Sequence, residues 1–393
     1  MHAAATPSRP LRVALVAGEA SGDTLGAGLI GAIERHAPGS QYFGIAGPAM
    51  AAAGCEPWHG TDELSVMGFA EVLKHLPRLL RLRRRLIARL ADAQPDVFIG
   101  IDSPDFNLPI AAALKRHGVP TVQYVSPQVW AWRQSRVVGI RDAVDLVLCV
   151  LPFETDFYDD HGVNAVFVGH PLADDIALDV DAAPARAELG IEQGVPLVAV
   201  LPGSRRTEVS RLARPFMETA QWLQRRKPGL NVVVALASES ARPLFLQMTR
   251  GIELDPPAQI VAGRARQCLA AASVVLTASG TASLEATLMK RPMVVAYILS
   301  GLTHRIYRSL GLRKLPHVAL PNLLAGRELF PEFLQRRVCA ELMGPVLETQ
   351  LAASEDRTGW YDAVKAIHEQ LRRGASKAAA AAVIDLLASR ERL

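Results

Sequence analysis

Two short segments of the chain combine residues that can bind a phosphate group. In each, an apolar run leads into small or hydroxyl-bearing residues that open a helix, at residues 195–209 and again at residues 273–286. Such a turn directs backbone N–H groups and the positive helix end toward an anion. Either turn alone is also typical of an ordinary helix cap. Together they predict a diphosphate, and hence a nucleotide, with candidate ligands Ser204, Arg205, Ser279, Gly280 and Thr281.

Two carboxylates follow the apolar run at residues 96–101 and are candidates for general-base chemistry. Asp102 and Asp105 stand where a buried strand would end, which is where parallel α/β sheets bind their ligands. Asp105 can instead cap a helix that begins at Phe106, whereas Asp102 has no such duty. We therefore assign the base to Asp102 and a supporting role to Asp105.

The first apolar run, residues 12–17, leads into the sequence GEASGD. This is not the GxGxxG fingerprint, so a nicotinamide site is disfavoured. Glu19, Ser21 and Gly22 favour a small polar ligand, and Asp23 is expected to cap the helix that follows.

A third segment, residues 124–133, places two tryptophans beside arginines. Trp130 and Trp132 follow an apolar run and a proline, and they predict a rigid apolar wall with Arg133 at its rim. Packing of either tryptophan in the core is an equal alternative. Arg136 and Arg141 can meet a phosphate or simply face water.

Residues 71–90 predict a basic amphipathic helix. Seven lysines and arginines occur there with no acid from Val72 to Ala91, and an apolar segment with Val66, Met67 and Phe69 precedes it. Such a helix is typical of an interfacial membrane segment, in which Arg83, Arg84 and Arg85 would face anionic headgroups. The alternative is a core-packed helix with an incidentally basic face. Pro77 is expected to kink or split the helix, whose apolar stripe is predicted as Leu73, Leu76, Leu80, Ile87 and Leu90.

These segments need a scaffold, and the pattern of the chain predicts one. Continuous apolar runs alternate with helical stretches, which indicates parallel strands buried on both faces. The strands are expected at residues 12–17, 41–46, 96–101, 121–125, 146–150, 165–168, 197–201, 231–235, 273–277, 293–297 and 318–320. Two doubly wound α/β domains of the Rossmann type, facing a cleft, are expected at residues 1–170 and 185–345, with a helical tail at 346–393.

Composition limits the class of protein. The chain has 393 residues, a net charge of +4 and a pI near 9.0, which does not by itself predict nucleic-acid binding. Four scattered cysteines are typical of buried thiols in a reducing compartment. No metal is expected: His170 and His304 lack partners at ligand spacing, and we discount the DxD at Asp179–Asp181 as chance. Without a signal peptide or membrane-spanning run, we expect a cytoplasmic protein attached to a membrane surface.

The motifs, in this order, resemble those of the lipid-A-disaccharide synthases. These are inverting glycosyltransferases of the two-Rossmann (GT-B) type in Gram-negative bacteria. The resemblance rests on VAGEASGD (16–23), GIDSPDFN (100–107), YVSPQVWAWR (124–133), LPGSR (201–205) with Glu208, ASGTASLEA (278–286) and PNLLAGREL (321–329).

The resemblance implies a reaction of lipid A biosynthesis. A 2,3-diacylglucosaminyl group would pass from UDP to the 6-hydroxyl of 2,3-diacylglucosamine 1-phosphate (lipid X), giving a β-1,6 disaccharide and UDP. It implies that Glu285 binds the ribose, that Asn322 and Gln335 belong to the donor site, and that no metal is needed. The acylated substrates imply contact with the cytoplasmic face of the inner membrane. A homodimer with exchanged C-terminal helices stays open.

Three other readings are weighed against this one, two of them enzymes of related fold and one a binding protein. The first is a UDP-sugar 2-epimerase, whose soluble substrate would leave the basic helix unexplained. The second is the lipid-II-forming transferase of peptidoglycan synthesis, but no segment of this chain matches the acceptor loop of that enzyme. A non-catalytic nucleotide-sugar or lipid-binding protein would have no use for Asp102.

Overall fold

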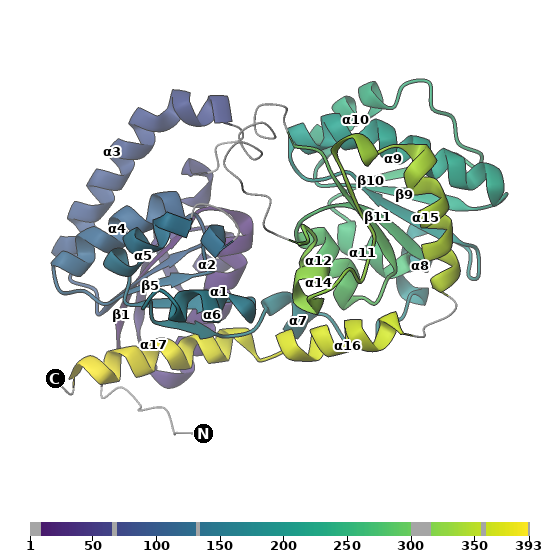
Figure 1. Ribbon diagram of the computed structural model, residues 1–393. Coiled ribbons are helices and arrows are strands. Elements are labelled where there is room, and N and C mark those ends of the chain that lie inside the picture. Colours follow the sequence, from purple (N-terminus) through teal and green to yellow (C-terminus); the bar gives the residue numbers. More distant parts are fainter. Residues whose placement is uncertain (1–8, 65–68, 131–133, 300–315, 355–358, 392–393) are drawn as a thin grey trace. The chain divides into compact units, whose positions relative to one another are not determined.

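The chain folds into two compact units, each with its own sheet. The computed structural model describes residues 9–64, 69–130, 134–299, 316–354 and 359–391. Unit 1 comprises Met1–Asp174 and Leu371–Leu393, and unit 2 comprises Asp175–Gln370 (Figure 1). The chain leaves unit 1 after Asp174, between the two domains predicted at residues 1–170 and 185–345. The helical segment predicted as a separate tail is divided, with residues 346–370 in unit 2 and the rest in unit 1.

The sheet of unit 1 is parallel throughout its described residues and has the strand order β3-β2-β1-β4-β5-β6-β7. Its central strands are apolar and buried on both faces, as the continuous apolar runs predict. The order reverses between β1 and β4. The strands are β1 (Arg12–Ala17), β2 (Gln41–Ala46), β3 (Cys55–Gly60), β4 (Val97–Ile101), β5 (Thr121–Tyr124), β6 (Leu146–Cys149) and β7 (Ala165–Phe167).

Helices cover both faces of this sheet, and α17 from the end of the chain packs against α1 (Figure 1). The Asp174 carboxylate caps α17 by accepting hydrogen bonds from the N–H groups of Gly374 at 2.8 Å and Ala375 at 2.6 Å. The helices of unit 1 are α1 (Ala20–His36), α2 (Pro48–Ala52), α3 (Phe69–Ala93), α4 (Pro104–Arg116), α5 (Val137–Ala143), α6 (Phe153–Asp159), α7 (Pro171–Asp175, reaching the boundary) and α17 (Ala375–Glu391).

Unit 2 repeats the plan with the strand order β10-β9-β8-β11-β12-β13, again parallel in its described residues. Its strands are β8 (Leu197–Leu201), β9 (Asn231–Leu236), β10 (Gln259–Ala262), β11 (Val274–Ala278), β12 (Met293–Tyr297) and β13 (Glu332–Leu334). Its helices are α8 (Ala183–Leu189), α9 (Arg206–Arg226), α10 (Arg242–Met248), α11 (Ala265–Ala271), α12 (Thr281–Leu288), α14 (Leu320–Ala325), α15 (Ala340–Ala353) and α16 (Trp360–Leu371, at the boundary). The doubly wound fold class is confirmed in both units.

The predicted elements differ from the structure mainly at the edges of the sheets. The strands β3, β10 and β13 were not predicted, and the strand predicted at residues 318–320 is wrong. That segment instead leads into α14, which begins at Leu320 with Pro321 in its first turn. Proline suits the start of a helix, because the missing N–H would have no helical acceptor there.

Of the two effects predicted for Pro77, a split of the basic helix is wrong, and a kink stays a prediction. The structure has one helix, α3, with Pro77 inside it. The proline lies on an exposed stretch, so water can bond the carbonyl that the missing N–H leaves unpaired.

The apolar stripe of α3 agrees with the prediction at Leu90 and differs from it at Leu76. The side chains of Leu82, Leu86 and Leu90 are buried in the core of unit 1, whereas Leu76 is 41% exposed. The buried positions follow an i, i+4 spacing, and α3 packs against α4. Leu80 and Ile87 are half-buried. Leu73 lies where side chains are not described.

Candidate active site

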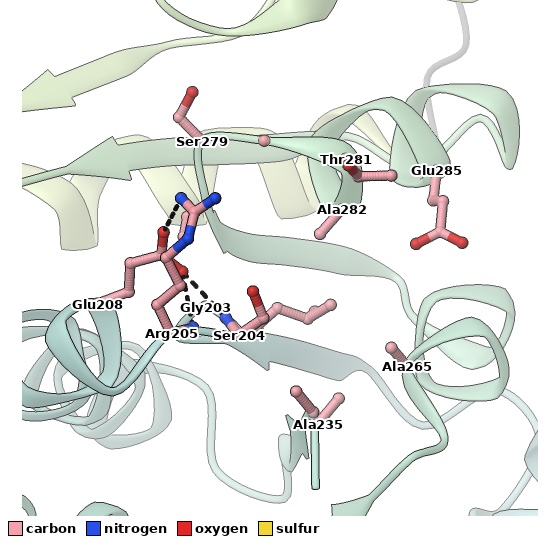
Figure 2. Close-up of a pocket in the computed structure, with 14 residues that line it drawn as sticks. Gly203, Ser204, Arg205, Glu208, Ala235, Ala265, Ser279, Thr281, Ala282 and Glu285 are labelled. Atoms are coloured by element: carbon pink, nitrogen blue, oxygen red, sulfur yellow. Dashed lines mark hydrogen bonds and ion pairs between the residues drawn. The ribbon is translucent and has the colours of Figure 1, made fainter. Parts of the chain in front are cut away.

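The two predicted phosphate-binding turns line one cavity in unit 2. Strands β8 and β11 are neighbours, with Leu201 paired to Thr277, so the turns that follow them leave the sheet at the same edge. Between these strands the sheet order reverses, which is the usual ligand position in such folds. The cavity has a volume of about 310 Å³ (Figure 2). It is lined by Ser204, Arg205, Ser279, Gly280, Thr281 and Glu285, together with Gly203, Glu208 and several alanines.

The first turn differs from the expectation of free N–H groups. The carboxylate of Glu208 accepts hydrogen bonds from the N–H groups of Ser204 at 3.0 Å and Arg205 at 3.2 Å (Figure 2). Gly203 makes this possible with a φ of 109°, because a Cβ there would come within 2.5 Å of Glu208. The turn therefore already holds an anion of its own. The Arg205 side chain remains 77% exposed while it contacts Glu208 at 3.3 Å.

The second turn offers its N–H groups more openly. Gly280 has a φ of 147°, and a Cβ built there would meet nothing within 4 Å. In the described part of the chain, the N–H groups of Thr281 and Ala282 have no acceptor, as expected for the first residues of α12. Ser279 Oγ donates to the carbonyl of Val318 at 3.1 Å. Of the two turns, this one has the N–H groups available to a phosphate.

Glu285 lies one helical turn into α12 and points into the same cavity (Figure 2). Burial raises the pKa of its carboxyl group, and Arg266, at 3.8 Å, opposes that shift. A partly buried carboxylate with unused acceptor capacity is suited to bind vicinal hydroxyls such as those of a ribose.

Asn322 and Gln335 do not line this cavity. The Asn322 side chain is fully buried and its amide donates to the Phe330 carbonyl and to Glu332, both at 2.7 Å. Its oxygen accepts from the N–H groups of Leu329 and Phe330. Asn322 therefore ties α14 to the segment before β13, a structural duty that the motif did not reveal. Gln335 follows β13 with a φ of 57°. A role for either in donor binding stays a prediction.

In unit 1, Asp102 stands on a strained turn directly after β4. Asp102 and Ser103 have φ angles of 52° and 38°, a left-handed conformation that L-residues rarely adopt. The Asp102 carbonyl accepts hydrogen bonds from the buried amides of Asn107 at 2.9 Å and Gln123 at 3.0 Å. The main chain of Asp102 is therefore held rigidly. Backbone strain of this kind collects at functional sites.

The two candidate carboxylates have different surroundings. In the described residues, the Asp102 carboxylate has no hydrogen-bond or ion-pair partner. Asp105 is 84% exposed and forms an ion pair with Arg136. Asp105 does not cap the following helix, as one reading proposed: α4 begins at Pro104, so Asp105 lies in its first turn and Ser103 is the N-cap residue. Of the two carboxylates, Asp102 is thus the one that stands on the strained turn with no partner among the described residues.

The GEASGD loop follows β1, the strand next to β4, and so reaches the same edge of the sheet as Asp102. Glu19 and Ser21 are exposed there, and Gly22 is buried in the first turn of α1. The expectation that Asp23 caps α1 is wrong. Asp23 is buried inside α1 and its carboxylate instead accepts from the N–H groups of Gly47, Ala49 and Met50, capping α2.

Trp130 is anchored through its indole N–H. The indole donates to the Glu154 carboxylate at 3.1 Å, and the ring packs edge-on against Phe153 with centroids 4.7 Å apart. Glu154 also accepts from the N–H of Leu151 at 3.1 Å. Trp130 is half-buried, so its exposure is intermediate between the two predictions, an exposed apolar wall and a side chain packed in the core. Arg133 lies outside the described residues.

The residues discounted as metal ligands have ordinary structural partners. Asp179 accepts from the Tyr361 hydroxyl at 3.1 Å, and Asp181 caps α8 by accepting from the N–H of Ala183 at 2.9 Å. His170 Nδ1 accepts from the N–H of Leu172 at 3.2 Å. His304 lies outside the described residues.

Comparison with known proteins identifies the family. A family model described as lipid-A-disaccharide synthetase matches residues 13–385, which is nearly the whole chain. The chain belongs to the lipid-A-disaccharide synthases. The lipid-A-disaccharide synthase of Xanthomonas campestris pv. campestris (strain 8004) is 48% identical over 384 residues, covering 98% of this chain and 88% of that protein. The resemblance drawn from the motifs is thereby confirmed.

Solved structures of distant proteins share the fold. The chain is similar to UDP-GlcNAc 2-epimerase from Neisseria meningitidis bound to UDP-GlcNAc, with a TM-score of 0.62, 11% identity and coverage of 98% of this chain and 100% of that one. It is also similar to CalG4, the calicheamicin glycosyltransferase, with a TM-score of 0.60, 16% identity and the same coverage. At these identities the likeness establishes the two-Rossmann fold and nothing finer.

Several residues that shape the site of this synthase were not found from the sequence. Asn107 and Gln123 hold the strained turn, and Glu154 anchors Trp130. Gln123 gave a signal, since a polar residue in an apolar strand must find a buried partner. Arg266, beside Glu285, gave none.

The raised pKa of the buried Glu154 carboxyl group predicts an unusual dependence of the free energy of unfolding on pH. Burial raises its pKa from 4.5 to about 7, although hydrogen bonds from Leu151 and Trp130 oppose the shift. Between these pH values the folded state binds more protons at this site than the unfolded state. Its contribution to stability therefore falls as pH rises through the window, by on the order of 3 kcal/mol in total.

Glu154→Gln removes this loss, although the single amide oxygen replaces two carboxylate oxygens that accept from the Leu151 N–H and the Trp130 indole. The difference in thermal midpoint, variant minus wild type, should be several degrees larger at pH 8 than at pH 5. Wild type and variant share the opposing effect of His170, whose pKa burial lowers to about 4. Differential scanning calorimetry at both pH values measures the change. A difference in midpoint that does not vary with pH contradicts the assignment.

Proposed function

We propose that the enzyme transfers a 2,3-diacylglucosaminyl group from UDP to the 6-hydroxyl of 2,3-diacylglucosamine 1-phosphate (lipid X). The products are the β-1,6 lipid A disaccharide 1-phosphate and UDP. Membership of the lipid-A-disaccharide synthases supports the forming of this disaccharide. A fold shared with an epimerase bound to UDP-GlcNAc supports a UDP-sugar donor. The observation on which the chemistry rests is the Asp102 carboxylate, which stands on a rigid, strained turn and has no partner among the described residues.

The bond changes follow from an inverting displacement. The 6-hydroxyl oxygen of the acceptor attacks C1 of the donor sugar as the bond between C1 and the diphosphate oxygen breaks. Asp102 takes the hydroxyl proton, and UDP leaves with the bonding electrons. Charge that grows on the diphosphate is stabilised by the Arg205 guanidinium and by the N–H groups at the start of α12. In this proposal Glu285 holds the ribose.

The proposed stabilisation of the diphosphate comes from protein groups, so we also propose that no metal ion is needed. Asp179 accepts from the Tyr361 hydroxyl and Asp181 from the N–H of Ala183, which supports a structural role for both residues. Activity that survives EDTA is the expected result. A strict requirement for a divalent cation would restore these two residues as candidates.

One assay separates the proposed function from its alternatives. The purified protein is incubated with UDP-2,3-diacylglucosamine, with and without lipid X, and released UDP and the disaccharide are measured. UDP release that depends on lipid X is expected. In parallel incubations with UDP-GlcNAc, formation of its 2-epimer would identify an epimerase, and transfer of the sugar to added lipid I would identify a peptidoglycan enzyme. Donor binding without any release would leave only a binding protein.

We further propose that the enzyme acts at the cytoplasmic face of the inner membrane, because its substrates are acylated. Among the described helices, none is long and apolar enough to cross a membrane. The basic face of α3 supports surface contact, but not with every predicted residue. Arg84 and Arg85 are exposed, whereas Arg83 donates to the carbonyl of Asp105 at 3.4 Å. Val66 and Met67 lie outside the described residues, and the Phe69 side chain is not described.

The exposed arginines of α3 provide the test. Changing Arg78, Arg84 and Arg85 together to serine should weaken binding to anionic vesicles about a hundredfold, since each cation contributes on the order of 1 kcal/mol. Added salt should weaken wild-type binding in the same way. Co-sedimentation with vesicles across a salt series measures both effects.

The matched control removes three exposed arginines elsewhere, Arg225, Arg250 and Arg372. It lowers the net charge by the same amount but leaves α3 unchanged. If α3 binds the membrane, this variant should retain vesicle binding. Equal loss in both triple variants would mean that net charge alone drives the association and that α3 has no special role.

A further inference from the structure

A surface groove runs between α4 and α5 of unit 1, outside the cavity described for the donor. It has a volume of about 500 Å³. Its walls are mostly apolar, with Leu108, Pro109 and Ala112 on one side and Gly139 and Ala143 on the other. The hollow exists because three of these five residues are small. A Cβ built on Gly139 would meet nothing within 4 Å.

One end of the groove carries charged side chains. Asp105 and Arg136, which form an ion pair, line that end of the groove. Asp105 is in the first turn of α4, three residues after Asp102. The groove therefore begins where β4 ends and continues along the outside of α4.

Pro109 links the groove to the basic helix α3. Because proline has no N–H, it cannot donate to the carbonyl of Asp105 four residues earlier in α4. That carbonyl instead accepts a hydrogen bond from Arg83 of α3 at 3.4 Å. Pro109 thus forms part of the apolar wall of the groove. It also leaves the Asp105 carbonyl, at the charged end of the groove, free to accept a hydrogen bond from Arg83.

We propose that this groove holds an acyl chain of the acceptor sugar, and this inference rests on the proposed function. The acceptor has an anionic sugar-phosphate head and apolar chains. The groove offers the matching order of surfaces, with the Asp105–Arg136 ion pair at one end and an apolar trough leading away from it. A protein partner or a second copy of the chain would not need a polar end only three residues along the chain from the candidate base.

Gly139→Leu tests the proposal by filling the trough. Gly139 is an exposed residue inside α5 with an ordinary φ, so leucine is tolerated there and has the higher helix propensity. With an acceptor that carries long acyl chains, kcat/KM should fall about tenfold, the usual effect of losing a few methylene contacts in a pocket. With an acceptor that carries two-carbon acyl groups, kcat/KM should be unchanged. The affinity for UDP should also be unchanged.

The matched control is Gly31→Leu on α1, an exposed helical glycine whose added Cβ would likewise meet nothing within 4 Å. It should leave both acceptors unaffected. Ala112→Leu narrows the trough from the opposite wall and should reproduce the selective loss, which guards against a folding defect specific to one variant. Thermal midpoints near wild type in all three variants show that folding is retained.

Two outcomes would overturn the proposal. Equal effects on long-chain and short-chain acceptors, or none on either, would mean that no acyl chain lies in the groove. A change in sedimentation coefficient with unchanged kinetics would make the groove an interface between copies. The proposed function fails separately, if wild type releases no UDP in the presence of lipid X.

Discussion

Replacing Asp102 with asparagine is expected to lower kcat by about two to four orders of magnitude, the usual contribution of a positioned general base. Asparagine has nearly the same shape but cannot accept the acceptor's proton. The left-handed turn should persist, because asparagine tolerates this conformation well and the amides of Asn107 and Gln123 bond the main chain rather than the side chain. The loss should therefore be chemical and not structural.

The matched control is Asp105→Asn. It removes a carboxylate that is already paired with Arg136 and lies mostly in solvent. We expect a much smaller loss of activity. Both variants should bind UDP as wild type does, because the cavity for the diphosphate lies in unit 2. Steady-state kinetics with lipid X and UDP titration measure these effects. Full activity in Asp102→Asn, with none in Asp105→Asn, would move the base to Asp105.

The sequence predicted the central strands well, because burial on both faces requires continuous apolar residues there. The edge strands obey weaker rules. Strand β3 contains Pro57, Trp58, His59 and Gly60, which read as a loop, and it is largely half-exposed or exposed. Strand β13 has three residues, too few for any period to show. Pairing with an existing sheet edge, and not local preference, makes these segments strands.

The positions of the candidate site residues follow from the same reasoning, but their hydrogen-bond partners do not. Parallel strands end at one edge, so the turns after β8 and β11 were bound to converge. A sequence does not reveal that Glu208 would occupy N–H groups expected to be open, or that Asp23 would cap α2 and not its own helix. Each of these bonds depends on how neighbouring elements pack, at distances that spacing along the chain does not fix.

Arg205→Ala is the second variant with a large expected effect. The guanidinium lines the donor cavity and is mostly exposed, so a bound diphosphate can receive two of its N–H bonds at once. If it also meets the charge that grows on departing UDP, its loss should lower kcat by about a hundredfold and weaken UDP binding by about tenfold. Arg205→Lys should recover only part of this, because an ammonium group keeps the charge but lacks the planar fork.

Arg206→Ala provides the matched control for Arg205. Arg206 is the next residue, equally basic and exposed, but it does not line the cavity. Its loss should change UDP affinity by less than about twofold, since an exposed charge outside the cavity makes no direct bond to the diphosphate and is screened by solvent and salt. Isothermal titration with UDP and steady-state kinetics give both quantities. Because Glu208 competes for Arg205, Glu208→Gln should relieve that competition yet remove the carboxylate that shapes the turn. If Arg205→Ala binds UDP as tightly as wild type, the diphosphate is held instead by the open N–H groups of α12.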